Sequence, residues 1–132
     1  RLQGDWSSDV CSSDLEIETK TVKEVQPDCY PLPESYEWCN VDMSNPTEAQ
    51  ELYELLGNHY VEDDGGTFRF DYSVEFLTWA LTPPGAKPEW LIGVRGGKKK
   101  RLFGFISGIP VHMRSLDKDV IMAEINFLCV HK

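Results

Sequence analysis

The chain has 132 residues, with 22 Asp and Glu against 13 Lys and Arg, for a formal charge of −9. Hydrophobic residues make up 41% of the chain, which supports a packed core of about one domain and excludes wholesale disorder. The acidic charge argues against nucleic acid as a partner, because duplex affinity depends on Lys and Arg that neutralise phosphates. No segment resembles a signal peptide or approaches the roughly 20 apolar residues of a membrane span. We therefore expect a cytoplasmic protein that is not an integral membrane protein.

The first 15 residues differ in character from the rest. The chain begins with Arg1, and residues 5–15 (DWSSDVCSSDL) have no helical or strand period and repeat Ser-Ser-Asp. They are similar, codon for codon, to the translation of a common sequencing-library adapter. We interpret residues 1–15 as a non-native, disordered tail, although a natural polar tail has a similar composition. Without this segment the chain keeps 12 basic and 19 acidic residues, a charge of −7.

Residues 16–44 are predicted to form an extended arm that lies on a surface. Pro27, Pro31 and Pro33 follow a polar stretch, and three prolines in seven residues forbid a helix. Its apolar anchors are Tyr30, Leu32, Tyr36 and Trp38.

Two helices are predicted next. Asn45-Pro46-Thr47-Glu48 combines a capping residue, a proline at the first helical position and an acid, and apolar residues follow at helical spacing until Gly57. Ser73 is expected to cap a second helix over residues 74–81, which Thr82-Pro83-Pro84-Gly85 would end.

The remaining residues have a strand-like pattern. Residues 88–95 and 101–110 are predicted to form a hairpin around a turn at 96–100, and a third strand is predicted over 120–130 after a polar turn at 115–119. The fold class is therefore α+β, with two helices packed on a three-strand antiparallel sheet. Because the strands are apolar on both faces, we expect a second covering layer, supplied by a helix beyond the last residue.

Several clusters could carry chemistry. The acidic stretch Glu62-Asp63-Asp64 fits a solvated loop or a site for a cationic ligand, and fits a metal site poorly because no His or further carboxylate stands at a defined spacing. Cys129 and His131 would share a strand face, but a buried core cysteine is favoured over a nucleophilic pair. The basic run 98–101 is better explained as a hairpin turn that protects the sheet edge than as a phosphate site.

Three cysteines lie outside the first 15 residues. Cys29, Cys39 and Cys129 are odd in number and widely spaced, so we expect reduced thiols and no metal site.

The third predicted strand loses its alternation at residues 127–130, which are all apolar. Such a break is typical of a β-bulge, where backbone N–H groups leave the ladder and can stabilise an oxyanion. A fully paired, buried strand end explains the same residues, and the pattern alone favours it.

Several long motifs occur in one order along the chain. They are Tyr60-Val61-Glu62-Asp63-Asp64, Phe68-Arg69-Phe70-Asp71-Tyr72-Ser73, Trp79-Ala80-Leu81-Thr82-Pro83-Pro84-Gly85, Gly104-Phe105-Ile106-Ser107-Gly108-Ile109-Pro110 and Glu124-Ile125-Asn126-Phe127-Leu128-Cys129-Val130-His131-Lys132. From about residue 27 to the end, the chain resembles eukaryotic glycylpeptide N-myristoyltransferase.

The resemblance implies an acetyltransferase-like (GNAT-like) fold, of which residues 45–132 would be a truncated N-terminal lobe. It implies an acyltransferase that moves myristoyl from myristoyl-CoA, a co-substrate and not a permanently bound cofactor, to the N-terminal glycine of proteins. The glycine amine would attack the thioester directly. The backbone amides of Phe127 and Leu128 would form the oxyanion hole, and Phe127, Leu128, Cys129 and Val130 would lie beside the acyl-CoA.

The resemblance also implies a peptide groove. Its expected residues are Tyr60, Val61, Glu62, Asp63, Phe68, Phe70 and Tyr72. Acidic side chains there would favour substrates with basic residues downstream of the glycine, bound by a monomeric enzyme. The chain departs from the family where Gly65-Gly66-Thr67 replaces a third acid, Asn and Met, so recognition of basic peptides is expected to be weaker.

The family's upstream acyl-CoA contact, its CoA-phosphate loop and its C-terminal carboxylate base would lie outside residues 16–132. We therefore expect the 132-residue chain to be inactive by itself. Two alternatives remain open: another acyl-CoA-dependent enzyme of the same fold, and a non-catalytic peptide-binding module.

Overall fold

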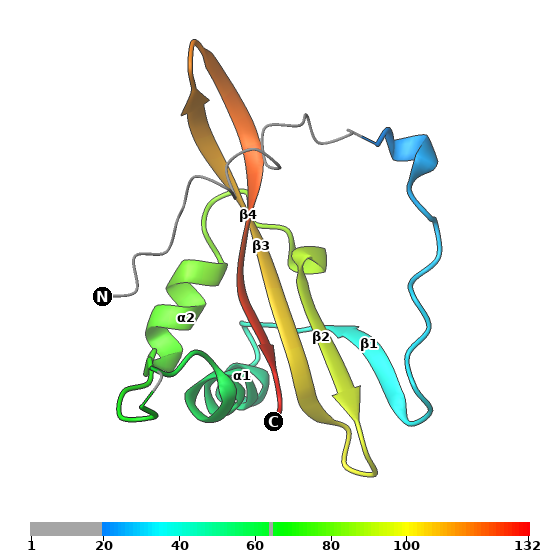
Figure 1. The fold of residues 1–132 in the computed structure, drawn as a ribbon, viewed down its shortest axis with the longest axis vertical. Helices are drawn as coiled ribbons and strands as arrows, with labels where there is room; N and C mark the ends of the chain where they lie inside the picture. Colours follow the sequence, from blue (N-terminus) through cyan, green and yellow to red (C-terminus); the bar gives the residue numbers. More distant parts are fainter. Residues whose placement is uncertain (1–19, 64) are drawn as a thin grey trace, which may run out of the picture. The chain divides into compact units, whose positions relative to one another are not determined.

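A computed structural model describes residues 20–63 and 65–132 (Figure 1). The chain divides into two compact units, residues 1–31 and 32–132. In the first unit, the described residues include one 3-10 turn, η2 (Val22–Glu24). The Glu24 carboxylate accepts hydrogen bonds from the backbone N–H and the hydroxyl of Thr21, at 2.7 and 2.8 Å. The tail predicted at residues 1–15 lies outside the described residues.

The second unit is built on one antiparallel sheet. Its strands follow the order β1-β2-β3-β4, and all neighbours are antiparallel. They are β1 (Tyr36–Asn40), β2 (Leu91–Gly96), β3 (Arg101–Ser115) and β4 (Lys118–Val130). Between β1 and β2 the chain forms α1 (Pro46–His59), α2 (Val74–Leu81) and the short η3 (Pro88–Trp90). The two helices pack against β3 and β4 (Figure 1).

The predicted α+β class with two helices on an antiparallel sheet is confirmed, but the prediction of three strands is wrong. The fourth strand is β1, which the sequence assigned to the extended arm. It pairs with β2 from Tyr36↔Gly96 to Asn40↔Ile92. A turn in which Pro33 accepts the Tyr36 N–H at 3.1 Å precedes it. The prolines therefore stop short of this segment, and its backbone is free to join a ladder that the local pattern does not reveal.

The helix starts agree with the sequence. Asn45 Oδ1 accepts the Thr47 N–H at 3.0 Å, and Ser73 Oγ accepts the Phe76 N–H at 3.2 Å. However, α1 continues two residues past Gly57. Arg69 Nη1 donates to the carbonyl oxygens of Gly57 and Asn58 at 3.2 and 2.7 Å, so the last turn of α1 receives partners from elsewhere in the fold.

The β3–β4 hairpin is longer than predicted. Its ladder continues to Ser115↔Lys118, and Leu116 adopts φ +54° in the short connection. The hairpin extends beyond the ends of β1 and β2 (Figure 1, top).

The hydrophobic core lies between the helices and one face of the sheet. Its members are Val41, Met43, Ala49, Leu52, Leu55, Leu56, Leu77, Leu81, Leu91, Leu102, Phe105, Phe127 and Cys129. On β4, Phe127 and Cys129 belong to this core, whereas Leu128 and Val130, which alternate with them along the strand, are 67% and 65% exposed. Within the described residues, the helices therefore cover one face of β4. No described helix is long and apolar enough to cross a membrane.

Candidate functional site

A β-bulge interrupts β4 at Phe127 and Leu128. Phe105 pairs with Cys129 and Ser107 pairs with Asn126, so two residues of β4 stand opposite the single residue between them on β3. Phe127 has φ +54°, a left-handed conformation that side-chain-bearing residues rarely adopt. The bulge, which was the less favoured of the two interpretations of the broken alternation, is therefore present, and the ladder resumes after it.

Side chains on both strands support the bulge. Asn126 Oδ1 accepts the Phe127 N–H at 2.8 Å, and the Ser107 hydroxyl, which is buried, donates to the Asn126 carbonyl at 3.0 Å. These contacts fix the backbone on either side of the Asn126–Phe127 peptide. Sequence reasoning missed Asn126 and Ser107 as supports, because their partners are defined only by the shifted register.

Cys129 is a buried thiol with no sign of activation. Its sulfur donates to the Leu55 carbonyl at 3.8 Å, and burial raises the pKa of the thiol. A raised pKa disfavours the thiolate that nucleophilic attack requires. The structure therefore shows Cys129 as a buried core cysteine, the interpretation that the sequence favoured over a nucleophilic pair.

An aromatic cluster connects the bulge with the acidic-aromatic loop (residues 60–72). The ring centroids of Tyr60 and Tyr72 lie 5.9 and 5.4 Å from that of Phe127. Tyr72 also stacks on Phe70 at 5.5 Å and on Phe76 of α2 at 5.2 Å. The loop is thus packed against both β4 and α2. Phe76 was not predicted as a site residue, although its position in the first turn after the loop is a usable signal.

The same loop lines an open hollow of about 290 Å³. Its lining residues are Val61, Glu62, Asp63, Phe68, Arg69 and Phe70. Five of the seven residues predicted for a peptide groove therefore meet around one hollow, and Tyr60 and Tyr72, the other two, lie against Phe127. Arg69 is the one lining residue that the sequence did not predict.

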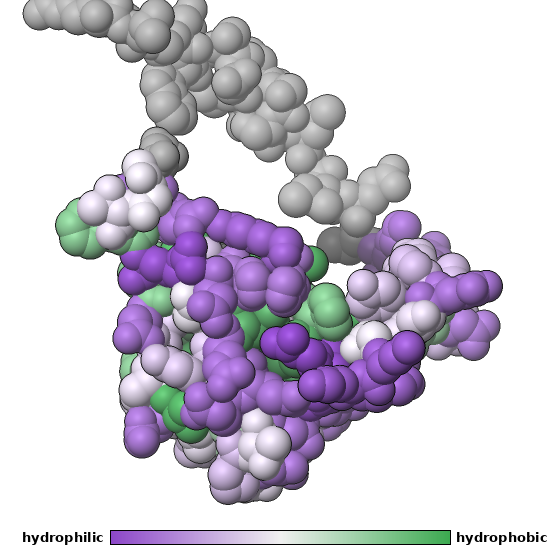
Figure 2. Space-filling model, turned by 90° about the horizontal axis from the view of Figure 1, so that it is seen from below, coloured by the Kyte–Doolittle hydropathy of each residue, from purple (hydrophilic) through white to green (hydrophobic). Residues whose placement is uncertain are grey.

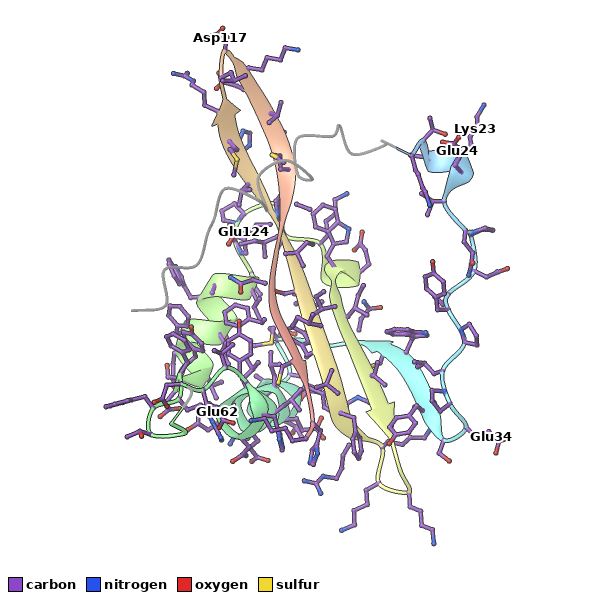
Figure 3. All side chains as sticks on the ribbon, viewed as in Figure 1. Lys23, Glu24, Glu34, Glu62, Asp117 and Glu124 are labelled. Carbon is purple, nitrogen blue, oxygen red and sulfur yellow. The ribbon has the colours of Figure 1, made fainter. Side chains whose placement is uncertain are left out.

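Two acids of the loop are committed to internal contacts. The Glu62 carboxylate is ion-paired with both Arg69 and Lys132, and these hydrogen bonds, that of Lys132 first, lower its pKa to about 2. Asp63 Oδ1 accepts the Phe68 N–H at 2.6 Å. Figure 3 places Glu62 beside the end of α1. The acidic charge predicted to attract basic peptides is thus partly used to shape the loop.

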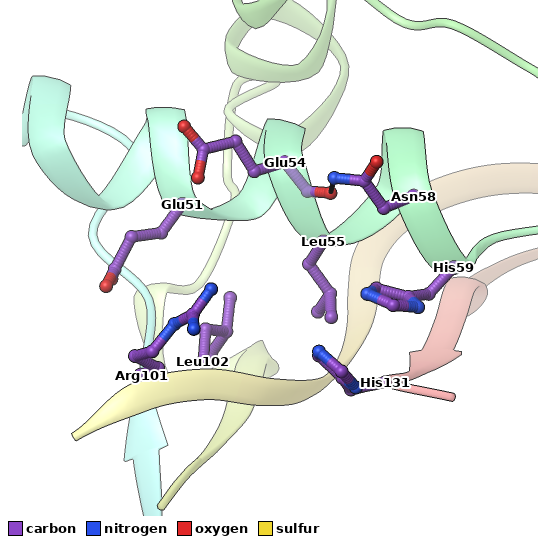
Figure 4. A pocket seen from close by; sticks show the side chains of 8 residues that line it. All are labelled: Glu51, Glu54, Leu55, Asn58, His59, Arg101, Leu102 and His131. Carbon is purple, nitrogen blue, oxygen red and sulfur yellow. Dashed lines mark hydrogen bonds between the residues drawn. The ribbon is translucent and has the colours of Figure 1, made fainter. Parts of the chain in front are cut away.

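A second, smaller hollow of about 100 Å³ lies between α1 and the ends of β3 and β4 (Figure 4). The rings of His59 and His131 face one another there at 3.9 Å. His59 Nδ1 accepts the Lys132 N–H at 3.2 Å, and burial, followed by the neighbouring cations, lowers the pKa of His59. The volume is below the roughly 300–1,000 Å³ of typical small-molecule sites.

The surface at this end of the molecule is mostly hydrophilic, with hydrophobic residues showing only in small areas (Figure 2). Among the described residues, no group of three or more His, Cys, Asp or Glu could hold a metal ion. The described cysteines, Cys29, Cys39 and Cys129, are free thiols.

Comparisons with known proteins identify the family. Residues 16–132 match the N-terminal domain of myristoyl-CoA:protein N-myristoyltransferase. Glycylpeptide N-tetradecanoyltransferase from Dictyostelium discoideum is 55% identical over 116 residues, which are 88% of this chain and 28% of that protein. Glycylpeptide N-tetradecanoyltransferase 1 from Arabidopsis thaliana is 54% identical over 111 residues, 84% of this chain and 26% of that protein.

A solved structure shows the same arrangement. Saccharomyces cerevisiae N-myristoyltransferase with bound myristoyl-CoA superposes with a TM-score of 0.77 at 44% identity, covering 88% of this chain and 26% of that one. The chain thus spans about a quarter of the length of the relatives it matches. The chain belongs to the myristoyl-CoA:protein N-myristoyltransferase family, within its N-terminal domain.

Proposed function

We propose that the whole protein transfers myristoyl from myristoyl-CoA to the N-terminal glycine of proteins, and that this chain contributes the oxyanion site and one wall of the peptide groove. The observation that carries the proposal is the bulge at Phe127 and Leu128, which lies within the segment matched by the family. A bulge disrupts the ladder locally and can turn backbone N–H groups toward a ligand.

In the proposed reaction, the glycine amine attacks the thioester carbonyl carbon. A C–N bond forms, the C–S bond breaks, and CoA leaves as a thiol after taking up the proton that the amine loses. The amides of Phe127 and Leu128 would stabilise the negative oxygen of the tetrahedral intermediate, an effect worth about 3–4 kcal/mol per donor. The Phe127 amide donates to Asn126 Oδ1 in this structure, so it would exchange this partner for the oxyanion.

Around this centre, Cys129 and Val130 would contact the acyl-CoA, and the hollow of the acidic-aromatic loop would hold the substrate peptide. Five predicted groove residues that meet around that hollow support the assignment. The partners would be glycine-starting peptides with basic residues downstream, in the cytoplasm, bound by a monomer. Myristoyl-CoA would act as co-substrate, with no permanently bound cofactor.

The test uses two polypeptides: the 132-residue chain, and a full-length chimera in which residues 16–132 replace the matching segment of the Dictyostelium relative. CoA release is measured with myristoyl-CoA and a glycine-starting peptide, with the N-acetylated peptide as control. The chimera should acylate only the free amine, and the 132-residue chain should be inactive. A folded chimera without transfer would refute the assignment, and turnover of acetyl-CoA in place of myristoyl-CoA would favour another enzyme of the same fold.

A further inference from the structure

The acidic-aromatic loop is attached to β4 at two separate points. At the first point, the Tyr60 hydroxyl donates to Asn126 Oδ1 at 3.5 Å, and the Tyr60 ring lies 5.9 Å from that of Phe127. At the second point, the Glu62 carboxylate meets Lys132, two residues after the end of β4. The attachments lie on either side of the strand end that follows the bulge. The loop therefore cannot shift along β4 without breaking one of them.

The second attachment joins three elements through one carboxylate. Glu62 Oε1 pairs with Lys132 Nζ, and Glu62 Oε2 pairs with Arg69 Nη2. Glu62 and Arg69 also face each other in an antiparallel β-bridge across the loop. Arg69 Nη1 donates to the Gly57 and Asn58 carbonyls at the end of α1. We name Glu62, Arg69 and Lys132 together the Glu62 clamp.

Both oxygens of Glu62 are thus occupied by cations of the chain itself. A cationic side chain of a substrate would have to displace Lys132 or Arg69 before it could pair with Glu62. Asp63 differs, because its carboxylate has a backbone N–H partner and no ion pair within the described residues. Two neighbouring acids of the same loop therefore have different electrostatic surroundings, and the sequence does not distinguish them.

We propose that Glu62 is a positioning residue, which holds the acidic-aromatic loop against the strand end that follows the bulge, and does not read the charge of the substrate. The inference rests on the proposed function and changes one assignment within it: Asp63 remains a candidate contact for a basic peptide, whereas Glu62 acts through Lys132 and Arg69. Loss of the clamp then loosens the groove for every peptide, whatever its charge.

The two roles predict different kinetics. A positioning role predicts that Glu62→Gln lowers kcat/KM by about three- to fivefold, mostly through KM, because partly exposed ion pairs contribute at most about that factor. The loss should be the same for a glycine-starting peptide with a downstream lysine and for the matched peptide with norleucine. Direct recognition of charge predicts a loss on the lysine peptide alone.

The test is a double-mutant cycle in the full-length chimera. Glu62→Gln, Lys132→Gln and the double variant are compared on both peptides, with Lys132→Arg as the rescue that restores the cation. Glu34→Gln is the matched control. It also removes one carboxylate charge, but Glu34 lies on the other side of the strands from Glu62 (Figure 3). Hydrogen exchange of residues 60–72 reports whether the loop loosens, and exchange of α2 reports whether a variant is folded.

We expect equal losses on both peptides, recovery with Lys132→Arg and faster exchange in residues 60–72. The double variant should be no worse than Glu62→Gln alone, because that substitution already removes both ion pairs of Glu62. A loss confined to the lysine peptide, or additive effects of the two substitutions, would overturn the clamp. If Glu62→Gln does not fold, Lys132→Gln on the two peptides decides the question alone. Absence of transfer by the unsubstituted chimera would count against the proposed function, whereas an unaffected Glu62→Gln would count only against the clamp.

Discussion

The positive φ of Phe127 can be tested by comparing alanine and glycine at this position. The Phe127 side chain is 8% exposed and packs on two tyrosine rings, so removing it should cost about 3–5 kcal/mol in either variant. The two variants differ in the backbone. At φ +54° a residue with Cβ pays about 1–2 kcal/mol, which glycine avoids, whereas glycine loses about 0.5–1 kcal/mol of chain entropy. Phe127→Gly should therefore be more stable than Phe127→Ala by about 0.5–1 kcal/mol.

Phe105 supplies the control, because it is 3% exposed, pairs with Cys129 across the same ladder and is absent from the residues with positive φ. There, glycine should be less stable than alanine by about 0.5–1 kcal/mol. The assay is urea unfolding followed by circular dichroism, with the free energies compared at equal slopes. If glycine is the less stable substitution at both positions, the left-handed bulge residue is refuted.

Three further predictions follow from individual groups. Gly93→Ala should lower the free energy of unfolding in urea by about 1–3 kcal/mol, because the added Cβ would lie 2.9 Å from a cysteine sulfur and from a leucine methyl. Gly57→Ala should raise the free energy of unfolding by about 0.5–1 kcal/mol, because an added Cβ at this position in α1 meets no atom within 4 Å. The ion pairs of Glu62 lower the pKa of its carboxyl from 4.5 to about 2 in the folded state, so their contribution to stability is fully present above pH 4.5 and is lost as the pH falls toward 2. Carbon NMR of the Glu62 carboxyl should show a titration midpoint near pH 2, and a midpoint near 4.5 would contradict the pairing. Iodoacetamide should modify the exposed Cys29 well before Cys129, which is buried and has a raised pKa; equal rates without unfolding would contradict that burial.

Much of the second unit could be predicted from local signals. The caps at Asn45 and Ser73 and the range 74–81 agree with the structure because capping and helical periodicity act over one or two turns of chain. β1 was missed, because it is only five residues long and four of the five are exposed, so its sequence carries little signal of the strand that it joins. The end of α1 was misplaced, because Arg69, twelve residues after Gly57, supplies the partners of its last carbonyls.

The candidate site divides in the same way. The sequence, through the family resemblance, predicted one loop and one strand end as the candidate site, and the broken alternation at residues 127–130 indicated a bulge as one of two interpretations. The structure decided between these interpretations through the register of β3 and β4. It also showed that five predicted groove residues share one hollow.

The sequence by itself determined the family resemblance, the α+β class and the segments from which the site is built, since these depend on neighbouring residues and on long motifs. Only the tertiary structure decided that Glu62 forms an ion pair with Lys132, 70 residues away. Likewise, only the fold showed that the Asn126 side chain accepts hydrogen bonds from the Phe127 N–H and from the Tyr60 hydroxyl. Such contacts depend on strand register and on how the loop packs, and many pairings of the same residues satisfy the local preferences equally well. The acidic charge of the chain is visible in its composition, but which acid is already neutralised is a property of the fold.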